Sequence, residues 1–309
     1  MKKLLLCIAF LASAAGIQAQ STEKEILKNT ETVINTIADT TGNGWSKKGT
    51  VTFLLNQSSF NNWIAGGESS LSGTLGLNYE LHYKDEKNTW DNRILANYGL
   101  QKTENSEFEK KTDDRLEINS VYGLKAYKEW YFSFILNFKT QFTTGYIYGE
   151  DENGKETREE KTDFFSPAYL TFGPGMYWKK SDNLKLNFAP LTSKITFVNS
   201  DYTSTADYIE GSYFGVDPFK SSRYELGFYA SAYYKFTIMK NVSAENFLNL
   251  YSNYLEDPQN VDIDYQINIV MTINKYLSAN FTFQTIYDDN AFQGFQTRQV
   301  FGIGVNYGF

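Results

Sequence analysis

The sequence predicts a single twelve-stranded antiparallel transmembrane β-barrel of the outer-membrane type, with short periplasmic turns and longer extracellular loops. Three observations lead to this fold class. Apolar and polar residues alternate with a period of two along twelve segments. Short and long connections alternate between the segments, as in bacterial outer-membrane barrels. Opposite charges meet when neighbouring segments are placed in register.

Composition agrees with strands that have two unlike faces. Aromatic residues make up 17% of the 309 residues, yet the mean hydropathy is −0.44. Alternating strands give such an average, because each apolar residue is followed by a polar one. Apart from the first residues, no apolar run is long enough for a transmembrane helix.

Residues 1–19 are predicted to be a signal peptide. Lys2 and Lys3 form a basic start, residues 4–15 are apolar, and cleavage is expected after Ala19, with Gly16 as the alternative. Cys7 is the only cysteine and lies in this segment, so the mature chain has no disulfide and no cysteine metal site. Removing the two lysines leaves 27 basic and 36 acidic residues, a net charge of −9, which argues against nucleic-acid binding.

Residues 20–45 are predicted to form a periplasmic N-terminal arm or short helix before a barrel that spans residues 46–309. Few aromatics occur in the arm, and Ile26, Val33 and Ile37 recur at roughly helical spacing. The TTGNG run at 40–44 then breaks the pattern. A spacer, a plug and a partner-docking element all remain open for this arm.

The twelve predicted strands follow one another without interruption. In the second and clearest one, Leu75, Leu77 and Tyr79 share one face, whereas Glu80 and His82 lie on the other. The predicted strands cover residues 50–56, 71–84, 90–101, 115–125, 130–142, 168–179, 184–198, 224–238, 242–254, 262–273, 277–287 and 298–309.

Three of these strands are irregular. Pro167 and Pro174 weaken the sixth, because proline cannot donate to a ladder. The seventh changes phase near Pro190, and a β-bulge at Ala189–Pro190 would restore its register. In the ninth, Asn246 falls on the apolar face.

The connections predict the orientation of the barrel. Five short turns face the periplasm, together with both termini, and six longer loops face outside. The loops are expected at 59–69, 103–114, 148–165, 199–222, 256–261 and 288–297. Loop 148–165 is acidic but lacks the spacing of a calcium loop, so it is expected to be solvated. Loop 199–222, the longest, could constrict the lumen or bind an external ligand.

Register predicts pairs of polar side chains on the inward face. Centring the second hairpin on Glu86–Lys87 places Glu80 opposite Arg93 and His82 opposite Asp91. Centring a later hairpin on Lys240 places Lys235 opposite Glu245 and Ser231 opposite Asn249 in the same way. A charge facing lipid at mid-bilayer would cost about 2–4 kcal/mol, which supports the assignment of these faces to the interior.

A mixed-sign ring at the periplasmic mouth of the lumen is the candidate site. Its members are Glu80, His82, Asp91, Arg93, Lys125, Lys235 and Glu245. Such a ring either selects passing solutes or packs the interior as a salt-bridge network. No catalytic residues are expected, because His82 is the only histidine and faces Asp91 inside. No cofactor or metal site is expected either.

The last strand closes the barrel in this interpretation. Phe301, Ile303 and Val305 lie on its apolar face, and Gly302 and Gly304 face inward, where they leave room for side chains of the first strand or for the arm. Outward aromatics near the short turns would form an interfacial girdle: Tyr83, Trp90, Trp130, Trp178, Tyr307 and Phe309. The terminal Phe309 is similar to the assembly signal of outer-membrane proteins.

Residues 44–309 also resemble a known family. The runs GWSKKGTVTFLLNQSSFNNWIAGGESSLSGTLGLNYELHY, FAPLTSKITFV and NYGF are similar to a Bacteroidetes family of outer-membrane β-barrels catalogued only as a domain of unknown function. The resemblance implies the fold and the location but supplies no site.

These observations lead to two hypotheses for a protein of the Gram-negative outer membrane. The first is a passive channel or transporter for small solutes. The alternative is a closed, non-conducting barrel that acts as anchor, adhesin or assembly partner through its loops or its arm. Expected partners are outer-membrane lipid, the barrel assembly machinery and, for a channel, a small solute; nucleic acid is not expected.

Overall fold

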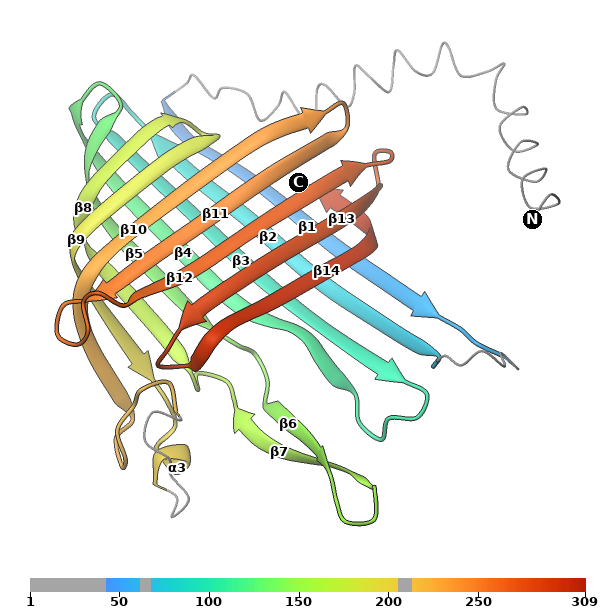
Figure 1. Ribbon diagram of the computed structural model, residues 1–309. Coiled ribbons are helices and arrows are strands. Elements are labelled where there is room, and N and C mark those ends of the chain that lie inside the picture. Colours follow the sequence, from blue (N-terminus) through green and yellow to red (C-terminus); the bar gives the residue numbers. More distant parts are fainter. Residues whose placement is uncertain (1–42, 62–67, 205–212) are drawn as a thin grey trace, which may run out of the picture. The chain divides into compact units, whose positions relative to one another are not determined.

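Twelve strands close into one antiparallel barrel in the computed structural model, which describes residues 43–61, 68–204 and 213–309 (Figure 1). Each strand pairs with its neighbour along the chain, and the first and last strands pair with each other. The barrel strands are β1 (Gly44–Ser58), β2 (Ser70–Lys84), β3 (Asn88–Thr103), β4 (Lys110–Tyr127), β5 (Trp130–Thr140), β8 (Ala168–Ser181), β9 (Leu184–Phe197), β10 (Ser222–Met239), β11 (Val242–Asn253), β12 (Val261–Thr272), β13 (Leu277–Asp288) and β14 (Phe292–Gly308). The predicted fold class is confirmed.

The start of the barrel differs slightly from the prediction. The signal peptide and the arm up to residue 42 lie outside the described residues. β1 already begins at Gly44, so residues 44 and 45 belong to the barrel rather than to the arm. Trp45 explains the difference, because its ring lies 5.1 Å from that of Tyr83 and 5.6 Å from that of Trp90. Tyr83 and Trp90 belong to the predicted aromatic girdle at the end that carries the short turns, and Trp45 adds a ring that was not predicted there.

The two ends of the barrel are called the turn end and the loop end below. At the turn end, β2–β3, β4–β5, β8–β9, β10–β11 and β12–β13 are joined by short connections, as predicted. One loop-end prediction is wrong. The expected long loop at 288–297 is a three-residue connection at 289–291, because β14 begins at Phe292. Residues 292–297 do not alternate in polarity, so the sequence pattern did not indicate that they continue the strand.

The expected loop 148–165 contains a second sheet. β6 (Gly145–Glu150) and β7 (Glu156–Thr162) form a two-stranded hairpin outside the barrel (Figure 1). Charged residues fill both faces of β7, so the sequence offered no apolar face from which to predict it. A short helix, α3 (Ser200–Thr203), lies in the β9–β10 connection. No helix in the described part of the chain has both the length and the hydropathy needed to cross a membrane.

The barrel exposes its apolar side chains and buries its polar ones. Along β5, Phe132 is 61% exposed and Phe134 47%, whereas Ser133 between them is 7% exposed. Leu75, Leu191 and Ile303 stand out in the same way on other strands. A band of large apolar side chains that covers the outside of a barrel suits a hydrocarbon surround rather than water.

The predicted bulge in the seventh strand is confirmed. Register against both β8 and β10 shifts by one residue between Ala189 and Thr192, around Pro190. The Thr192 hydroxyl donates to the Ala189 carbonyl at 2.8 Å, which closes the bulge on itself. Before the bulge the buried side chains of β9 include Asn187 and Ala189, at odd positions, and after it they include Thr192 and Lys194, at even positions. The bulge therefore determines which side chains of β9 face the interior.

The seam between β1 and β14 is as predicted. Thr50 to Leu55 pair with Gly308 to Ile303, and Phe309 exchanges two backbone hydrogen bonds with Gly49. A Cβ on Gly304 would lie 2.7 Å from Asn280 Nδ2 and 2.9 Å from Leu54 Cδ2. The inward glycines of β14 therefore leave room for side chains from both neighbouring strands.

Candidate functional site

The predicted polar pairs of the interior have the expected register. Glu80 pairs with Arg93, His82 with Asp91, Lys235 with Glu245, and Ser231 with Asn249. Local alternation and hairpin length determined these pairs, so the sequence was sufficient to find them. The structure places six members of the predicted ring in two neighbouring clusters, which touch where His82 Nε2 lies 3.4 Å from Glu80.

The turn-end cluster centres on Asp91, a side chain on β3 that is 8% exposed. One carboxylate oxygen lies 2.7 Å from His82 Nδ1 and 2.8 Å from the Lys179 ammonium, and the other accepts from the Tyr177 hydroxyl at 2.6 Å. Tyr177 and Lys179 come from β8, so these bonds pass over the inner faces of β4 and β5. The turn-end cluster also includes Lys185, 3.7 Å from Asp91.

The middle cluster contains Glu80, Arg93, Lys235 and Glu245. Arg93 lies 3.9 Å from Glu80 on the neighbouring strand and 3.7 Å from Glu245, and its guanidinium stacks 4.2 Å from the Phe247 ring centroid. Lys235 lies 2.6 Å from Glu245. Arg93 is on β3 and Glu245 on β11, six places apart in the ring of twelve strands. This contact therefore joins opposite walls of the barrel.

Lys125, the seventh predicted member, lies apart from both clusters. Its ammonium is 3.3 Å from the Tyr131 hydroxyl and 4.7 Å above that ring, and its side chain is exposed. Lys125 lies on the inner register but next to the β4–β5 turn, too close to the rim to reach across the lumen.

A third cluster, which the sequence did not predict, spans the interior nearer the loop end. In this loop-end cluster Arg115 donates to Gln266 at 2.7 Å, and Lys139 lies 2.5 Å from Asp264. Arg115 Nε also donates a hydrogen bond of 2.8 Å to the carboxylate of Glu117, a residue that is 3% exposed. β4 and β12 are opposite strands of the ring, so the Arg115–Gln266 bond is a second bridge between opposite walls.

A vestibule of about 600 Å³ lies against the loop-end cluster and opens toward the loops. Arg115, Lys139 and Asp264 belong to its lining, together with Arg298, which forms an ion pair with Asp113. Tyr146 and Tyr148 of β6 line it as well, so the external hairpin forms part of the vestibule wall. Its other lining residues include Lys111, Asp114, Tyr169, Gln284, Gln296 and Thr297.

The external hairpin is fixed to the β3–β4 connection by Glu156. This carboxylate accepts from the Lys110 ammonium at 2.5 Å, the Ser106 hydroxyl at 2.8 Å and the Glu107 amide at 2.9 Å. The hydrogen bond from Lys110, followed by that from Ser106, lowers the pKa of the Glu156 carboxyl to about 2. Arg158 lies 4.6 Å from the Phe108 ring and 4.3 Å from the Tyr146 ring. The hairpin is thus an ordered feature of the external surface.

Comparisons with known proteins give a family match over part of the chain. The sequence profile of a family described as "Protein of unknown function (DUF3078)" matches residues 55–146. No curated protein matches the sequence.

Solved barrel structures are similar to this chain at low identity. The translocator domain of the autotransporter NalP from Neisseria meningitidis is 9% identical, with a TM-score of 0.41 over 94% of this chain and 98% of that one. An outer membrane channel from Pseudomonas putida F1 is 7% identical, with a TM-score of 0.37 over 86% and 95%. The NanC porin is 9% identical, with a TM-score of 0.32 over 84% and 97%.

Proposed function

We propose that this protein is an integral barrel of the Gram-negative outer membrane, exported by its N-terminal signal. The apolar outer band, the aromatic rim around Trp45 and the paired seam support this proposal. A closed barrel satisfies every backbone group between its strands, which is what a hydrocarbon environment demands. Its partners are then outer-membrane lipid and the assembly machinery, with Phe309 as the assembly signal.

We further propose that the barrel is closed and non-conducting, and that it anchors an ordered external surface. One observation carries this proposal: Arg93–Glu245 and Arg115–Gln266 join opposite walls at two levels of the interior. Lys139–Asp264 adds a further bridge between β5 and β12. An interior that is spanned by side chains leaves little cross-section for a solute. The structure therefore favours the alternative hypothesis over the open channel.

The external hairpin is the surface that such an anchor would present. Glu156 and Arg158 hold it against the β3–β4 connection, and the Tyr202 hydroxyl on α3 bonds to Glu160 from the other side. A hairpin held on two sides is preorganised, which lowers the entropic cost of binding a partner.

Single-channel recording in planar bilayers tests the closed state. The wild-type protein is expected to give almost no conductance steps, whereas Arg93→Ala combined with Arg115→Ala is expected to give discrete, reproducible steps. Arg158→Ala, which removes a guanidinium from the external hairpin, is the matched control and should stay silent. Folding of each variant is verified by its heat-dependent migration in gels. Wild-type steps as large as those of the double variant would overturn the proposal.

A gated channel for small solutes is the second candidate, and the vestibule favours it. A cavity of about 600 Å³ leads from the loop end to bridges made by side chains alone, which rotamer changes could open. Solute-driven swelling of proteoliposomes would distinguish the two candidates. Swelling of wild-type proteoliposomes in a small neutral sugar, equal to that of the double variant, would favour the channel.

We propose no enzymatic activity for this chain. His82 is the only histidine, and both of its ring nitrogens face carboxylates, Asp91 at 2.7 Å and Glu80 at 3.4 Å. Such an imidazole is held within an ion-pair network rather than aimed at a reacting group.

A further inference from the structure

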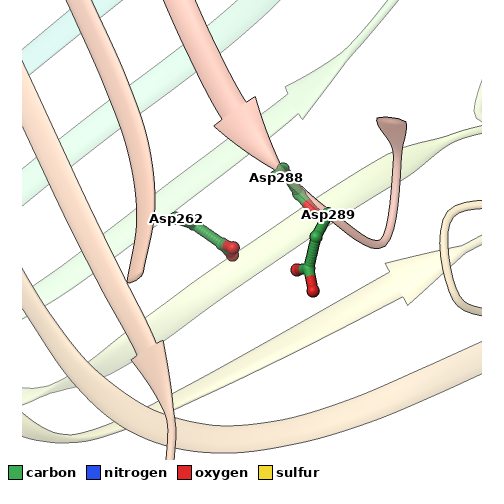
Figure 2. Close-up of side chains that lie close together, drawn as sticks. All are labelled: Asp262, Asp288 and Asp289. Atoms are coloured by element: carbon green, nitrogen blue, oxygen red, sulfur yellow. The ribbon is translucent and has the colours of Figure 1, made fainter. Parts of the chain in front are cut away.

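Three carboxylates meet at the loop end of the barrel. Asp262 is the second residue of β12, Asp288 ends β13 and Asp289 follows it. One carboxylate oxygen from each lies within 4.8 Å of the others. Figure 2 shows the Asp262 carboxylate pointing across toward those of Asp288 and Asp289. Calcium binds oxygen ligands at about 2.3–2.6 Å, so two ligands on opposite sides of one ion lie roughly 5 Å apart. The spacing fits a single ion that touches all three side chains.

A buried carboxylate oxygen beside these aspartates is an independent sign of a ligand. Glu225 on β10 is 2% exposed, and its Oε1 atom has no hydrogen-bond partner. Arg223 approaches Oε1 only to 3.6 Å, which is too long for a hydrogen bond. Glu225 lines a small cavity of about 40 Å³ together with Asp262 and Asp289. Buried polar atoms are nearly always satisfied, so a group inside this cavity is expected to bind Oε1.

Tyr251 gives a second sign of the same kind. It lies directly across from Asp262 in the β11–β12 register, and its buried hydroxyl also lacks a hydrogen-bond partner. Two of the four buried side-chain atoms without such a partner, among the residues that the structure describes, thus belong to this corner of the barrel.

Charge at the site is unbalanced. The cavity and the aspartate cluster contain six acids: Glu225, Glu256, Asp257, Asp262, Asp288 and Asp289. Two cations reach them. Lys194 lies 2.8 Å from Asp262, 3.6 Å from Asp288 and 3.5 Å from Glu225 Oε2. Arg223 lies 2.7 Å from Glu256 and 3.6 Å from Glu225 Oε1. Within the described ranges, Asp289 has no ion pair. Four negative charges remain in excess, and a divalent cation on the side of Asp289 and Glu225 would halve that excess.

The donor set identifies the class of cation. Carboxylates, the side-chain amides of Asn253, Asn260 and Asn290, and the Arg223 guanidinium line the cavity, so every potential ligand atom is an oxygen and no sulfur or imidazole lines it. All-oxygen, irregular sets with several ligands suit calcium better than magnesium, which demands a strict octahedron and keeps its waters. The loop end faces the external medium in the proposed orientation, where calcium is free to bind.

We propose that Asp262, Asp288 and Asp289 bind one calcium ion at the loop end, with the buried Glu225 as a further ligand. The ion would tie β10 and β12 to the β13–β14 connection, and through Asn253 and Asn260 it would reach the β11–β12 connection. This proposal goes beyond the closed anchor described above and does not depend on it, because the site lies apart from the wall-to-wall bridges. The calcium site is compatible with a non-conducting barrel and with a conducting one.

Calcium titration of the full-length protein, stripped with chelator and refolded in detergent, tests the site. Isothermal titration is expected to give one site with a dissociation constant of about 10⁻⁴–10⁻³ M, the usual range for extracellular calcium modules. Asp289→Asn is expected to weaken calcium binding at least tenfold. This exposed residue lies in a connection, so its replacement should not prevent folding. Asp201→Asn, an exposed acid in α3 at the same end, is the matched control and should bind as the wild type does.

A second readout keeps the test decisive. Calcium is expected to raise the unfolding temperature of the wild type and of the control, and not that of Asp289→Asn or Glu225→Gln. Absence of calcium binding by the wild type would overturn the proposal, and so would equal binding by Asp289→Asn. Equal affinity for magnesium would overturn the assignment to calcium.

Discussion

The turn-end and loop-end clusters both bury charge inside the barrel, yet they differ in what holds them together. At the turn end, His82 and Asp91 face each other on adjacent strands, and Asp91 has several partners. At the loop end, Arg115 and Gln266 come from opposite walls, 151 residues apart in the chain. The turn-end register follows from a hairpin, whereas the loop-end contacts exist only once the barrel has closed. Barrel closure therefore sets the Arg115–Gln266 contact at the loop end, whereas hairpin register sets the His82–Asp91 pair at the turn end.

The largest expected loss of stability comes from a substitution in the loop-end cluster. Arg115→Ala leaves Glu117, 3% exposed, without its guanidinium, and a buried charge that loses its partner costs about 3–5 kcal/mol. We expect the free energy of unfolding, measured by urea titration in lipid vesicles, to fall by about 3 kcal/mol. Adding Glu117→Gln should recover most of this loss, since the uncompensated charge is then gone. A loss below that of the turn-end variant described next would break the comparison.

The turn end should tolerate substitution better. His82→Gln removes one partner of Asp91, but Lys179 and Tyr177 remain at 2.8 and 2.6 Å, and glutamine can still donate a hydrogen bond. The expected loss of unfolding free energy is about 1 kcal/mol or less, in the same vesicle assay. His82→Leu, which cannot donate, serves as the reference for the full loss of that hydrogen bond.

The smallest changes in stability are expected from the protonation of two acids outside the membrane-spanning strands, one at each end of the barrel. Both Asp85 and Glu156 have a pKa lowered to about 2, from ordinary values of 3.8 and 4.5. For Asp85 the cause is the Asn88 side chain and then the amides of Lys87 and Asn88, all within one turn. For Glu156 the cause is the hydrogen bond from Lys110, the first residue of β4, and then that from Ser106 in the β3–β4 connection. A depressed pKa contributes stability above the ordinary value, and this is lost as the pH falls toward 2.

Carboxyl titration by nuclear magnetic resonance in micelles measures both groups. Lys110→Met is expected to raise the pKa of Glu156 toward its ordinary value and to leave that of Asp85 unchanged. High salt should act in the same direction, because the Lys110–Glu156 pair is only partly buried and so is open to screening by dissolved ions. A pKa of Glu156 that ignores both changes would show that the hairpin is not held through this ion pair.

Much of the fold was predictable because alternation and hairpin length are local. These signals determined the strand count, the β9 bulge and the pairs Glu80–Arg93 and Lys235–Glu245. The predicted strands included Arg115 and Lys139, but the partners of these residues on β12 were not identified, because contacts across a lumen leave no regular spacing in the sequence. The β6–β7 hairpin was missed because it has no apolar face, and its charges were read as a solvated loop.

The same limit explains the aspartate cluster. Asp262 belongs to a regular alternating strand, and Asp288 and Asp289 follow another, so no motif of fixed spacing joins them to Glu225. Calcium loops with an ordered spacing can be found in a sequence, but a site assembled from three strands cannot. The only sign of this site in the sequence was the presence of acidic residues near the loop ends of predicted strands.

The seam has a consequence for the order in which the barrel forms. β1 and β14 share six registered residue pairs, whereas β1 and β2 share fifteen. The seam also joins the two strands that lie farthest apart in the barrel sequence, so its loop-closure entropy is the largest of any pairing. We expect strands that are adjacent in the sequence to pair first. The β1–β14 seam is then the last pairing to form during membrane insertion. Under mechanical pulling on either terminus, the same seam should be the first contact to part.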